Sequence, residues 1–211
     1  MIRLIAVAFM FCSVALPAAE PPSSGTSTPS RVGQIYMFRG VIGAMTPCVT
    51  DFSRQLRAAG FNAFSYEDFL GHSIVLEIER NYARSPQHEP LVLVGYSSGS
   101  VTAVAIARRL NRSHIPVDLL VTLDPLASET VPENVRVCLN YYKQTIPGVS
   151  VLSGTTMKAE PAVRLENIKL KTGNHFWLLE SPEVNAAVTA PIAALCSRRS
   201  SDSATAAHGL M

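Results

Sequence analysis

Short apolar runs alternate with helix-like stretches along most of this 211-residue sequence, and this alternation limits its fold more than any other feature. The run at 91–94 (Leu-Val-Leu-Val) is wholly aliphatic, which is typical of a strand buried on both faces. Strands are predicted at 34–38, 61–66, 91–94, 117–123, 135–142 and 163–170, and helices at 47–59, 73–84, 98–112 and 182–196. Strands joined through helices form a largely parallel sheet that is covered on both faces, so we predict one α/β domain over 34–196 with about six strands.

The chain begins with a segment typical of protein export. Arg3 precedes an apolar run at 4–16, and small residues follow at Ala18 and Ala19. This run is shorter than the ~20 residues that a membrane-spanning helix needs, so we predict a secretory signal peptide at 1–19; the alternative is a buried N-terminal helix. The Pro/Ser/Thr-rich stretch 20–33 is predicted to be a linker, and the Ser/Ala-rich stretch 197–211 a disordered tail. We expect a periplasmic or secreted protein with no stable membrane insertion once the signal is removed.

Charge and cysteine content exclude several classes of protein. The 18 basic and 16 acidic residues leave a net charge of +2, which gives no support to nucleic-acid binding through phosphate neutralisation. Cys12 would leave with the signal peptide, and Cys48, Cys138 and Cys196 would remain, which allows at most one intramolecular disulfide among them. The sequence has no Cys-x-x-Cys pair and no Cys/His cluster, so neither a metal nor another cofactor is predicted.

A G-x-S-x-G motif lies between the predicted strand at 91–94 and the predicted helix at 98–112. Its residues are Gly95, Tyr96, Ser97, Ser98 and Gly99. A serine on a sharp strand-to-helix turn needs glycines two positions away on either side, because Cβ atoms there would clash. The motif in this context predicts a nucleophilic Ser97; the alternative is a glycine-bounded turn with an idle serine.

With this motif in place, the sequence resembles the α/β-hydrolase superfamily over roughly 34–196. The catalytic residues of that superfamily follow the chain order serine, acid, histidine. Asp124 comes directly after the predicted strand 117–123, at the carboxyl edge of the sheet where such sites lie, whereas Asp118 begins that strand and falls at the opposite edge. Asp124 is therefore the predicted acid, although an Asp-Pro turn or a helix cap would also explain it. Weaker candidates for the acid are Glu129, Glu133, Glu160 and Glu166.

His175 is the predicted base. It follows the last predicted strand and precedes the last predicted helix, a position similar to the superfamily's catalytic histidine loop. Three other histidines precede Asp124 and so break the superfamily's order, and one lies in the predicted tail. These four are His72, His88, His114 and His208. A structural histidine in a surface loop is the alternative for His175.

The resemblance implies an acyl-serine mechanism. A serine hydroxyl needs an adjacent base, so His175 would take the proton of Ser97 and pass it to the leaving group, while Asp124 would hold the imidazole in the correct tautomer. The backbone amide of Ser98, immediately after the nucleophile, would donate to the oxyanion.

A second oxyanion donor is expected from the loop after the first strand. Val41 is the first choice and Gly40 the second, since this loop occupies the place of the superfamily's His-Gly element. This sequence departs from that element at Arg39, where the superfamily usually has histidine.

The resemblance implies esters or thioesters as substrates. Only a short segment separates Asp124 from the next predicted strand, which leaves no room for a helical lid and predicts a site open to solvent. The position of the acid resembles several thioesterases, whereas the compact exported form resembles cutinases and small lipases; amide hydrolysis and acyl transfer use the same chemistry. Four apolar residues near the site fit either an acyl chain or core packing. They are Tyr96, Leu126, Phe176 and Trp177.

Two other classes of function can use an α/β fold. A non-catalytic binding or scaffold protein on a hydrolase-like fold is the alternative, because a fold alone does not fix a function. A nucleotide-binding protein is not predicted, since no lysine follows Gly99 and the first loop lacks G-x-G-x-x-G.

Overall fold

The computed structural model describes residues 31–40, 47–67, 70–84, 89–143, 154–171, 175 and 177–196. The predicted signal peptide, the predicted tail and most of the predicted linker lie outside these residues. So do four single residues discussed above, which are Val41, His88, Phe176 and His208.

Within the described residues, six parallel strands form the central sheet, in the order β2-β1-β3-β4-β6-β8. The strands are β1 (Gln34–Arg39), β2 (Ala63–Glu67), β3 (Leu91–Tyr96), β4 (Val117–Leu123), β6 (Val135–Tyr142) and β8 (Arg164–Lys169). Both the α/β class and the expected number of strands are confirmed. In the centre of the sheet Tyr96 pairs with Leu123, so the residues that follow β3 and β4 emerge at the same edge.

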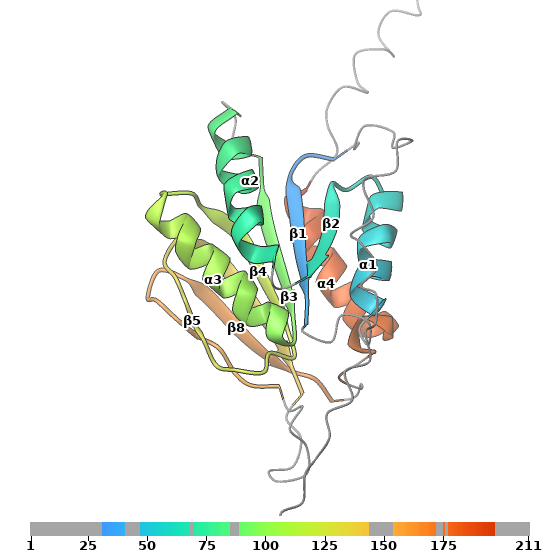
Figure 1. Ribbon diagram of the computed structural model, residues 1–211. Coiled ribbons are helices and arrows are strands. Elements are labelled where there is room, and N and C mark those ends of the chain that lie inside the picture. Colours follow the sequence, from blue (N-terminus) through green and yellow to red (C-terminus); the bar gives the residue numbers. More distant parts are fainter. Residues whose placement is uncertain are drawn as a thin grey trace, which may run out of the picture.

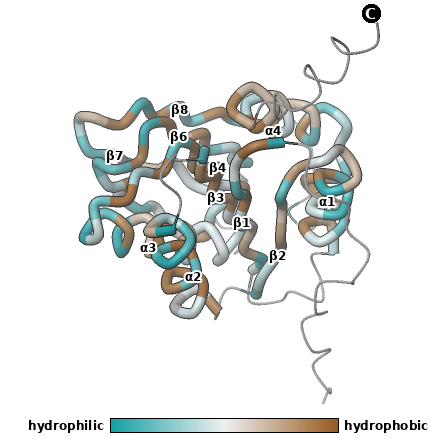
Figure 2. The backbone as a smooth tube through the Cα atoms, turned by 90° about the horizontal axis from the view of Figure 1, so that it is seen from above, coloured by the Kyte–Doolittle hydropathy of each residue, from teal (hydrophilic) through white to brown (hydrophobic). Residues whose placement is uncertain are grey.

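Helices cover both faces of the sheet, and each pair of helices encloses its own core (Figures 1 and 2). The helices are α1 (Pro47–Ala58), α2 (Gly71–Arg84), α3 (Ser98–Arg112) and α4 (Pro182–Leu195). Phe52 of α1 and Ile192 of α4 pack on one face, against strand residues such as Val94. Ile78 of α2 and Leu110 of α3 pack on the other face. This arrangement is the one that alternating strands and helices predict. In the described part of the chain, no helix is long and apolar enough to cross a membrane.

Beside α3 the chain forms a small second sheet that the sequence analysis did not predict. Strands β5 (Thr130–Val131) and β7 (Lys158–Ala159) pair in parallel. Val131 and Met157 are buried in the core that contains α3. This small sheet therefore lies on the face of the central sheet that α2 and α3 cover. Among the described residues between β4 and β8, it takes the place of a crossover helix on that face.

A polar network fixes the segment around β7 to the central sheet. Asn140 on β6 is fully buried, and its amide nitrogen donates to the Thr155 carbonyl at 2.9 Å and to Asn167 Oδ1 at 2.7 Å. Asn167 on β8 in turn bonds both the amide and the carbonyl of Met157, at 2.8 and 3.1 Å. Buried polar groups are stable only when they are paired, so these side chains require one position of the 154–159 segment.

The ends of the predicted elements differ from the observed ones by a few residues. β3 continues to Tyr96 and not only to residue 94, because its pairing with β4 extends into the G-x-S-x-G motif. Contacts with the domain begin at Arg31, three residues before the predicted start, since the Arg31 guanidinium donates to the carbonyls of Ala59 and Cys196.

Candidate active site

The structure brings Ser97, Asp124 and His175 together at the carboxyl edge of the sheet. His175 Nε2 lies 3.1 Å from Ser97 Oγ, and its Nδ1 lies 2.7 Å from Asp124 Oδ2. All three side chains are buried, with Asp124 only 1% exposed. The arrangement can take a proton from the serine hydroxyl and stabilise the resulting imidazolium beside a carboxylate.

Ser97 lies on a sharp turn between β3 and α3 and has strained backbone angles. Its φ of 57° and ψ of −123° fall in a region that side-chain-bearing residues rarely adopt. The turn is held from both sides, because the Ser97 amide donates to the Leu123 carbonyl at 2.8 Å and Ser100 Oγ donates to the Gly95 carbonyl at 2.9 Å. This backbone conformation directs the Ser97 hydroxyl away from the strand and toward His175.

The two glycines of the motif are required by close approach of the backbone. A Cβ atom on Gly95 would lie 2.4 Å from Ser100 Cα, and one on Gly99 would lie 2.2 Å from the Phe38 carbonyl oxygen. Neither neighbour is a flexible side-chain end, so neither contact can relax easily. The structure thus gives the steric reason that the sequence motif implied.

Asp124 is held by a main-chain donor as well as by His175. Its Oδ1 accepts a hydrogen bond of 2.8 Å from the Lys143 amide, which follows β6. Asp124 itself has a φ of 48°, a further strained position next to the site. Each carboxylate oxygen therefore has its own donor, which fixes the orientation of the carboxylate toward the imidazole.

Gly154 packs directly against the Asp124 carboxylate. A Cβ atom built on Gly154 would lie 1.8 Å from Asp124 Oδ1 and 3.1 Å from Asp124 Cα. The Gly154 amide donates to the Lys143 carbonyl at 3.0 Å, so the backbone at Lys143 and the backbone at Gly154 are joined beside the carboxylate. Sequence reasoning did not find Gly154 or the Lys143 amide, because no local pattern links them to Asp124.

We predict that Gly154→Ala slows the reaction of Ser97 with a fluorophosphonate probe by about 100-fold, since displacing a catalytic group by roughly 1 Å costs that much. The extra methyl group must move Asp124 or the backbone beside it. Gly71→Ala is the matched control, because the Cβ added there meets only side-chain atoms, first Thr102 Cγ2 at 2.9 Å. Labelling rates of both variants, with circular dichroism to check folding, measure the effect. Wild-type labelling of Gly154→Ala would show that Asp124 tolerates displacement.

The predicted oxyanion residues are described in part. Gly40 follows β1 and lies beside the nucleophile, since a Cβ atom built on it would be 3.1 Å from Ser97 Cβ. Ser98 is the first residue of α3 and directly follows the nucleophile. Val41 lies outside the described residues. Arg39, which replaces the usual histidine, ion-pairs with Glu67 of β2 and donates to Thr50 of α1 at 3.2 Å.

The weaker candidates for the acid have other surroundings. Glu129 pairs with Arg108 at 2.6 Å, and Glu166 pairs with Arg164 at 2.6 Å. Glu133 and Glu160 are exposed. Asp118 lies near the start of β4, at the opposite edge of the sheet from the triad, as expected. There it accepts a hydrogen bond of 3.0 Å from the Leu91 amide.

The apolar residues near the site divide into buried and exposed ones. Tyr96 is fully buried in the core under α1 and α4, so it does not line a surface for an acyl chain. Leu126 and Trp177 are 43% and 47% exposed. Each follows a triad residue by two positions.

The absence of a lid and the openness of the site have different outcomes. Residues 125–134 are all described, and β5 is the regular element in them, so no helical lid is inserted there. The expectation of an open site is wrong for the triad side chains, because Ser97 is 7% and His175 9% exposed.

The three described cysteines are buried thiols, and no disulfide joins them. Burial raises the pKa of the Cys48 thiol above its usual value, that of Cys138 to about 12 and that of Cys196 to about 11. A thiol is nucleophilic as the thiolate, so these cysteines are inert at neutral pH and do not compete with Ser97. Among the described residues, no three His, Cys, Asp or Glu side chains are arranged to hold a metal ion.

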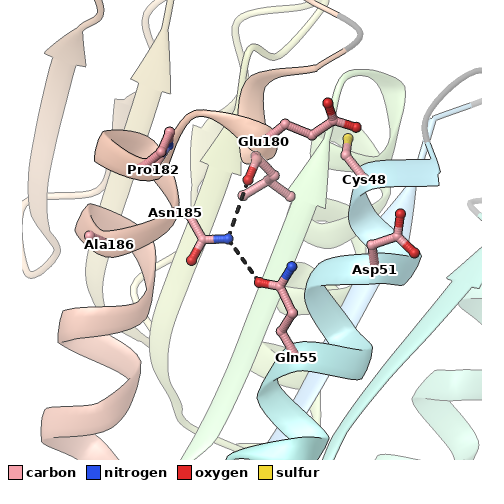
Figure 3. Close-up of a pocket in the computed structure, with 8 residues that line it drawn as sticks. Cys48, Asp51, Gln55, Glu180, Pro182, Asn185 and Ala186 are labelled. Carbon is pink, nitrogen blue, oxygen red and sulfur yellow. Dashed lines mark hydrogen bonds between the residues drawn. The ribbon is translucent and has the colours of Figure 1, made fainter.

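A groove of about 470 Å³ lies between α1 and α4, next to the 3-10 helix η3 (Leu178–Glu180). In Figure 3 Asn185 of α4 reaches across toward α1, and it donates to Gln55 Oε1 at 3.1 Å and to the Leu179 carbonyl at 3.2 Å. The residues that line it are Cys48, Asp51, Gln55, Leu179, Glu180, Pro182, Asn185 and Ala186. None of the triad residues belongs to this lining, so the groove is separate from the candidate active site.

Comparison with known proteins gives matches among solved structures only. No protein-family model and no curated protein sequence matches the chain. The NocB thioesterase domain from the nocardicin cluster is 11% identical, with a TM-score of 0.47 over 75% of this chain and 93% of its own. The RedJ thioesterase of the prodiginine pathway in Streptomyces coelicolor is 13% identical, with a TM-score of 0.45 over 86% of this chain and 96% of its own. Lipase B of Aspergillus fumigatus is 12% identical, with a TM-score of 0.47 over 75% of this chain and 50% of its own.

The architecture of the chain itself identifies its fold. The sheet is parallel, a strained serine directly follows its inner strand β3, and the acid and histidine follow later in the chain at the same edge. The described chain therefore has the α/β-hydrolase fold, in a form without a helical insertion between β4 and β6.

Proposed function

We propose that the protein is an exported serine hydrolase that cleaves carboxylic esters or thioesters through an acyl-serine intermediate. The observation that carries this proposal is the continuous chain of contacts from Ser97 Oγ through His175 to Asp124, at 3.1 and 2.7 Å. Nucleophile, base and orienting acid within hydrogen-bond distance of one another are the signature of covalent catalysis by serine.

The reaction begins when His175 Nε2 takes the proton of the Ser97 hydroxyl as Oγ attacks the substrate carbonyl. The carbonyl oxygen becomes an oxyanion, which the Ser98 amide and an amide of the Gly40–Val41 loop would stabilise. The imidazolium then gives its proton to the departing alcohol or thiol, and the acyl group stays on Oγ. Water, deprotonated by the same imidazole, repeats the sequence and releases the acid.

Exposed apolar side chains favour substrates with an apolar acyl or alcohol group. Leu126 and Trp177 are large, nearly half exposed, and placed two residues after Asp124 and His175 respectively. Large exposed apolar side chains close to a catalytic centre are typical of a surface that binds apolar ligands. The proposal accordingly includes aryl and alkyl esters and acyl thioesters as the compounds to test first.

Export rests on the N-terminal sequence alone. Arg3, the apolar run at 4–16 and the small residues Ala18 and Ala19 form the pattern of a secretory signal peptide. The proposed hydrolase would act in the periplasm or outside the cell.

Reaction with a serine-directed fluorophosphonate tests the proposal. We predict that the folded wild-type protein is labelled on Ser97 and that it hydrolyses some members of a chain-length panel of aryl esters and acyl thioesters. Mass spectrometry of the labelled peptide locates the adduct, and the panel ranks the acyl groups. A folded protein that neither reacts with the probe nor hydrolyses any ester or thioester would instead be a non-catalytic binding protein on this fold.

A further inference from the structure

The second residue of the G-x-S-x-G motif has contacts that the proposed mechanism does not use. Tyr96 ends β3 immediately before the nucleophile, and its side chain turns into the core between α1 and α4. It is fully buried and reaches the segment that carries His175, which is 79 residues later in the chain. A tyrosine hydroxyl buried this deeply is stable only with partners, so its partners show what it holds.

The Tyr96 hydroxyl bonds the chain on both sides of Trp177. It donates to the His175 carbonyl, and it accepts from the Leu178 amide at 3.2 Å. Leu178 is the first residue of η3, and an amide at that position has no partner within its own helix. One hydroxyl therefore caps η3 and also fixes the main chain at the proposed catalytic histidine through a hydrogen bond.

The Tyr96 ring also contacts the His175 ring. The two ring centroids are 5.9 Å apart and the planes meet at 60°, an edge-to-face arrangement. Burial raises the pKa of Tyr96 above its usual value, so the hydroxyl stays protonated and keeps donating over the whole accessible pH range. The hydroxyl also interacts with the Cys48 thiol of α1, which is buried in the same core.

We propose that Tyr96 is a positioning residue that sets the His175 imidazole in line between Ser97 and Asp124. It takes no part in bond making or breaking, and it acts through the backbone carbonyl and the ring of His175. The inference rests on the proposed function, in which His175 is the base. It adds a role for the variable position of the motif: the residue before the nucleophile links the serine turn to the histidine segment.

Tyr96→Phe tests the proposal, because it removes the hydroxyl and keeps the ring and nearly the whole side-chain volume. Without the hydroxyl, the His175 carbonyl and the Leu178 amide lose their partner, and the segment must shift to satisfy them. We expect kcat for an aryl ester to fall about 10- to 100-fold, with KM changed by less than about threefold, because the defect lies in alignment and not in substrate binding.

Tyr141→Phe is the matched control. The Tyr141 hydroxyl also donates to a main-chain carbonyl, that of Ala187 in α4 at 3.0 Å, and the residue is 5% exposed in the same core. We expect this variant to lose comparable thermal stability while it keeps kcat within about twofold. A general loss of stability would lower kcat equally in both variants and would overturn the proposal.

Spectroscopy gives a reading that does not depend on turnover. The proton between His175 Nδ1 and Asp124 is expected to give a downfield signal in the proton NMR spectrum of the wild type and of Tyr141→Phe, and to weaken or disappear in Tyr96→Phe. An unchanged signal together with wild-type kcat in Tyr96→Phe would overturn the positioning role. If the wild type hydrolyses nothing, the proposed function fails, and this signal still tests whether Tyr96 positions His175.

Hydrogen exchange on the wild type covers the case in which Tyr96→Phe does not fold. The Leu178 amide, which donates to the Tyr96 hydroxyl, is expected to exchange slowly. Fast exchange at Leu178 would show that the hydrogen bond from its amide to the Tyr96 hydroxyl is not formed in solution, and it would overturn the proposal.

Discussion

Ser97→Ala is expected to abolish ester and thioester turnover, with a loss of about 10⁶-fold in kcat, and to prevent fluorophosphonate labelling altogether. Oγ is the only heavy atom that the substitution removes, and it is the atom that lies 3.1 Å from His175 Nε2. The chain should remain folded, because alanine is smaller than serine and its side chain introduces no clash at the turn. Kinetics on the best ester of the panel, with thermal unfolding of the same preparation, separate the two effects.

A buried serine elsewhere provides the control for this experiment. Ser53 of α1 is fully buried, and its hydroxyl donates to the Thr50 carbonyl at 2.9 Å. Ser53→Ala should therefore lose some stability and keep its turnover. Wild-type rates in Ser97→Ala, with the adduct found on another residue, would place the nucleophile elsewhere and contradict the proposed mechanism.

The three triad residues could be found in the sequence because each has a local signal. Ser97 lies between glycines after an aliphatic run, and Asp124 ends a second such run. His175 is indicated by its position after Asp124, between the last predicted strand and the last predicted helix. Parallel strands have their carboxyl ends at one edge of the sheet, so residues that follow different strands meet there without any further information.

The residues that hold the triad in place could not be found in the same way. Gly154 approaches Asp124 from 30 positions away in the sequence, and the Tyr96 hydroxyl meets His175 from 79 positions away. Such contacts depend on how loops cross the edge of the sheet, and nothing in the neighbouring sequence encodes that path. Likewise β5 and β7 have two residues each, too few to show the alternation by which a strand is recognised.

The exposure of the site also depends on these loops. A short segment after Asp124 correctly predicted that no helical lid is inserted there. It did not predict that the triad side chains are buried, because their burial is set by contacts among loops that are distant in sequence. The same long-range contacts determine how sensitive the site is to changes around Asp124.

Asp124→Asn is expected to lower kcat by about 10⁴-fold with little effect on folding. The carboxylate has two different tasks, since Oδ1 accepts from the Lys143 amide at 2.8 Å and Oδ2 contacts His175 Nδ1 at 2.7 Å. An asparagine can keep its oxygen on the Lys143 amide only by turning its NH2 group toward Nδ1. Nδ1 must then act as an acceptor, which places the imidazole proton on Nε2, where it can no longer take the proton of Ser97.

Asp118→Asn separates this tautomer effect from the loss of a paired carboxylate charge. Asp118 is on the same strand, and it too uses both oxygens, accepting from the Leu91 amide at 3.0 Å and pairing with Arg136 at 3.1 Å. It lies at the opposite edge of the sheet, so its replacement should reduce stability and leave kcat near the wild-type value. The tautomer effect predicts a loss of about 10⁴-fold, which is easily distinguished from a loss of about tenfold. If Asp124→Asn kept kcat within about tenfold of the wild type, Asp124 would not orient the base. A loss of equal size in both variants would instead attribute the effect to the stability of β4 as a whole.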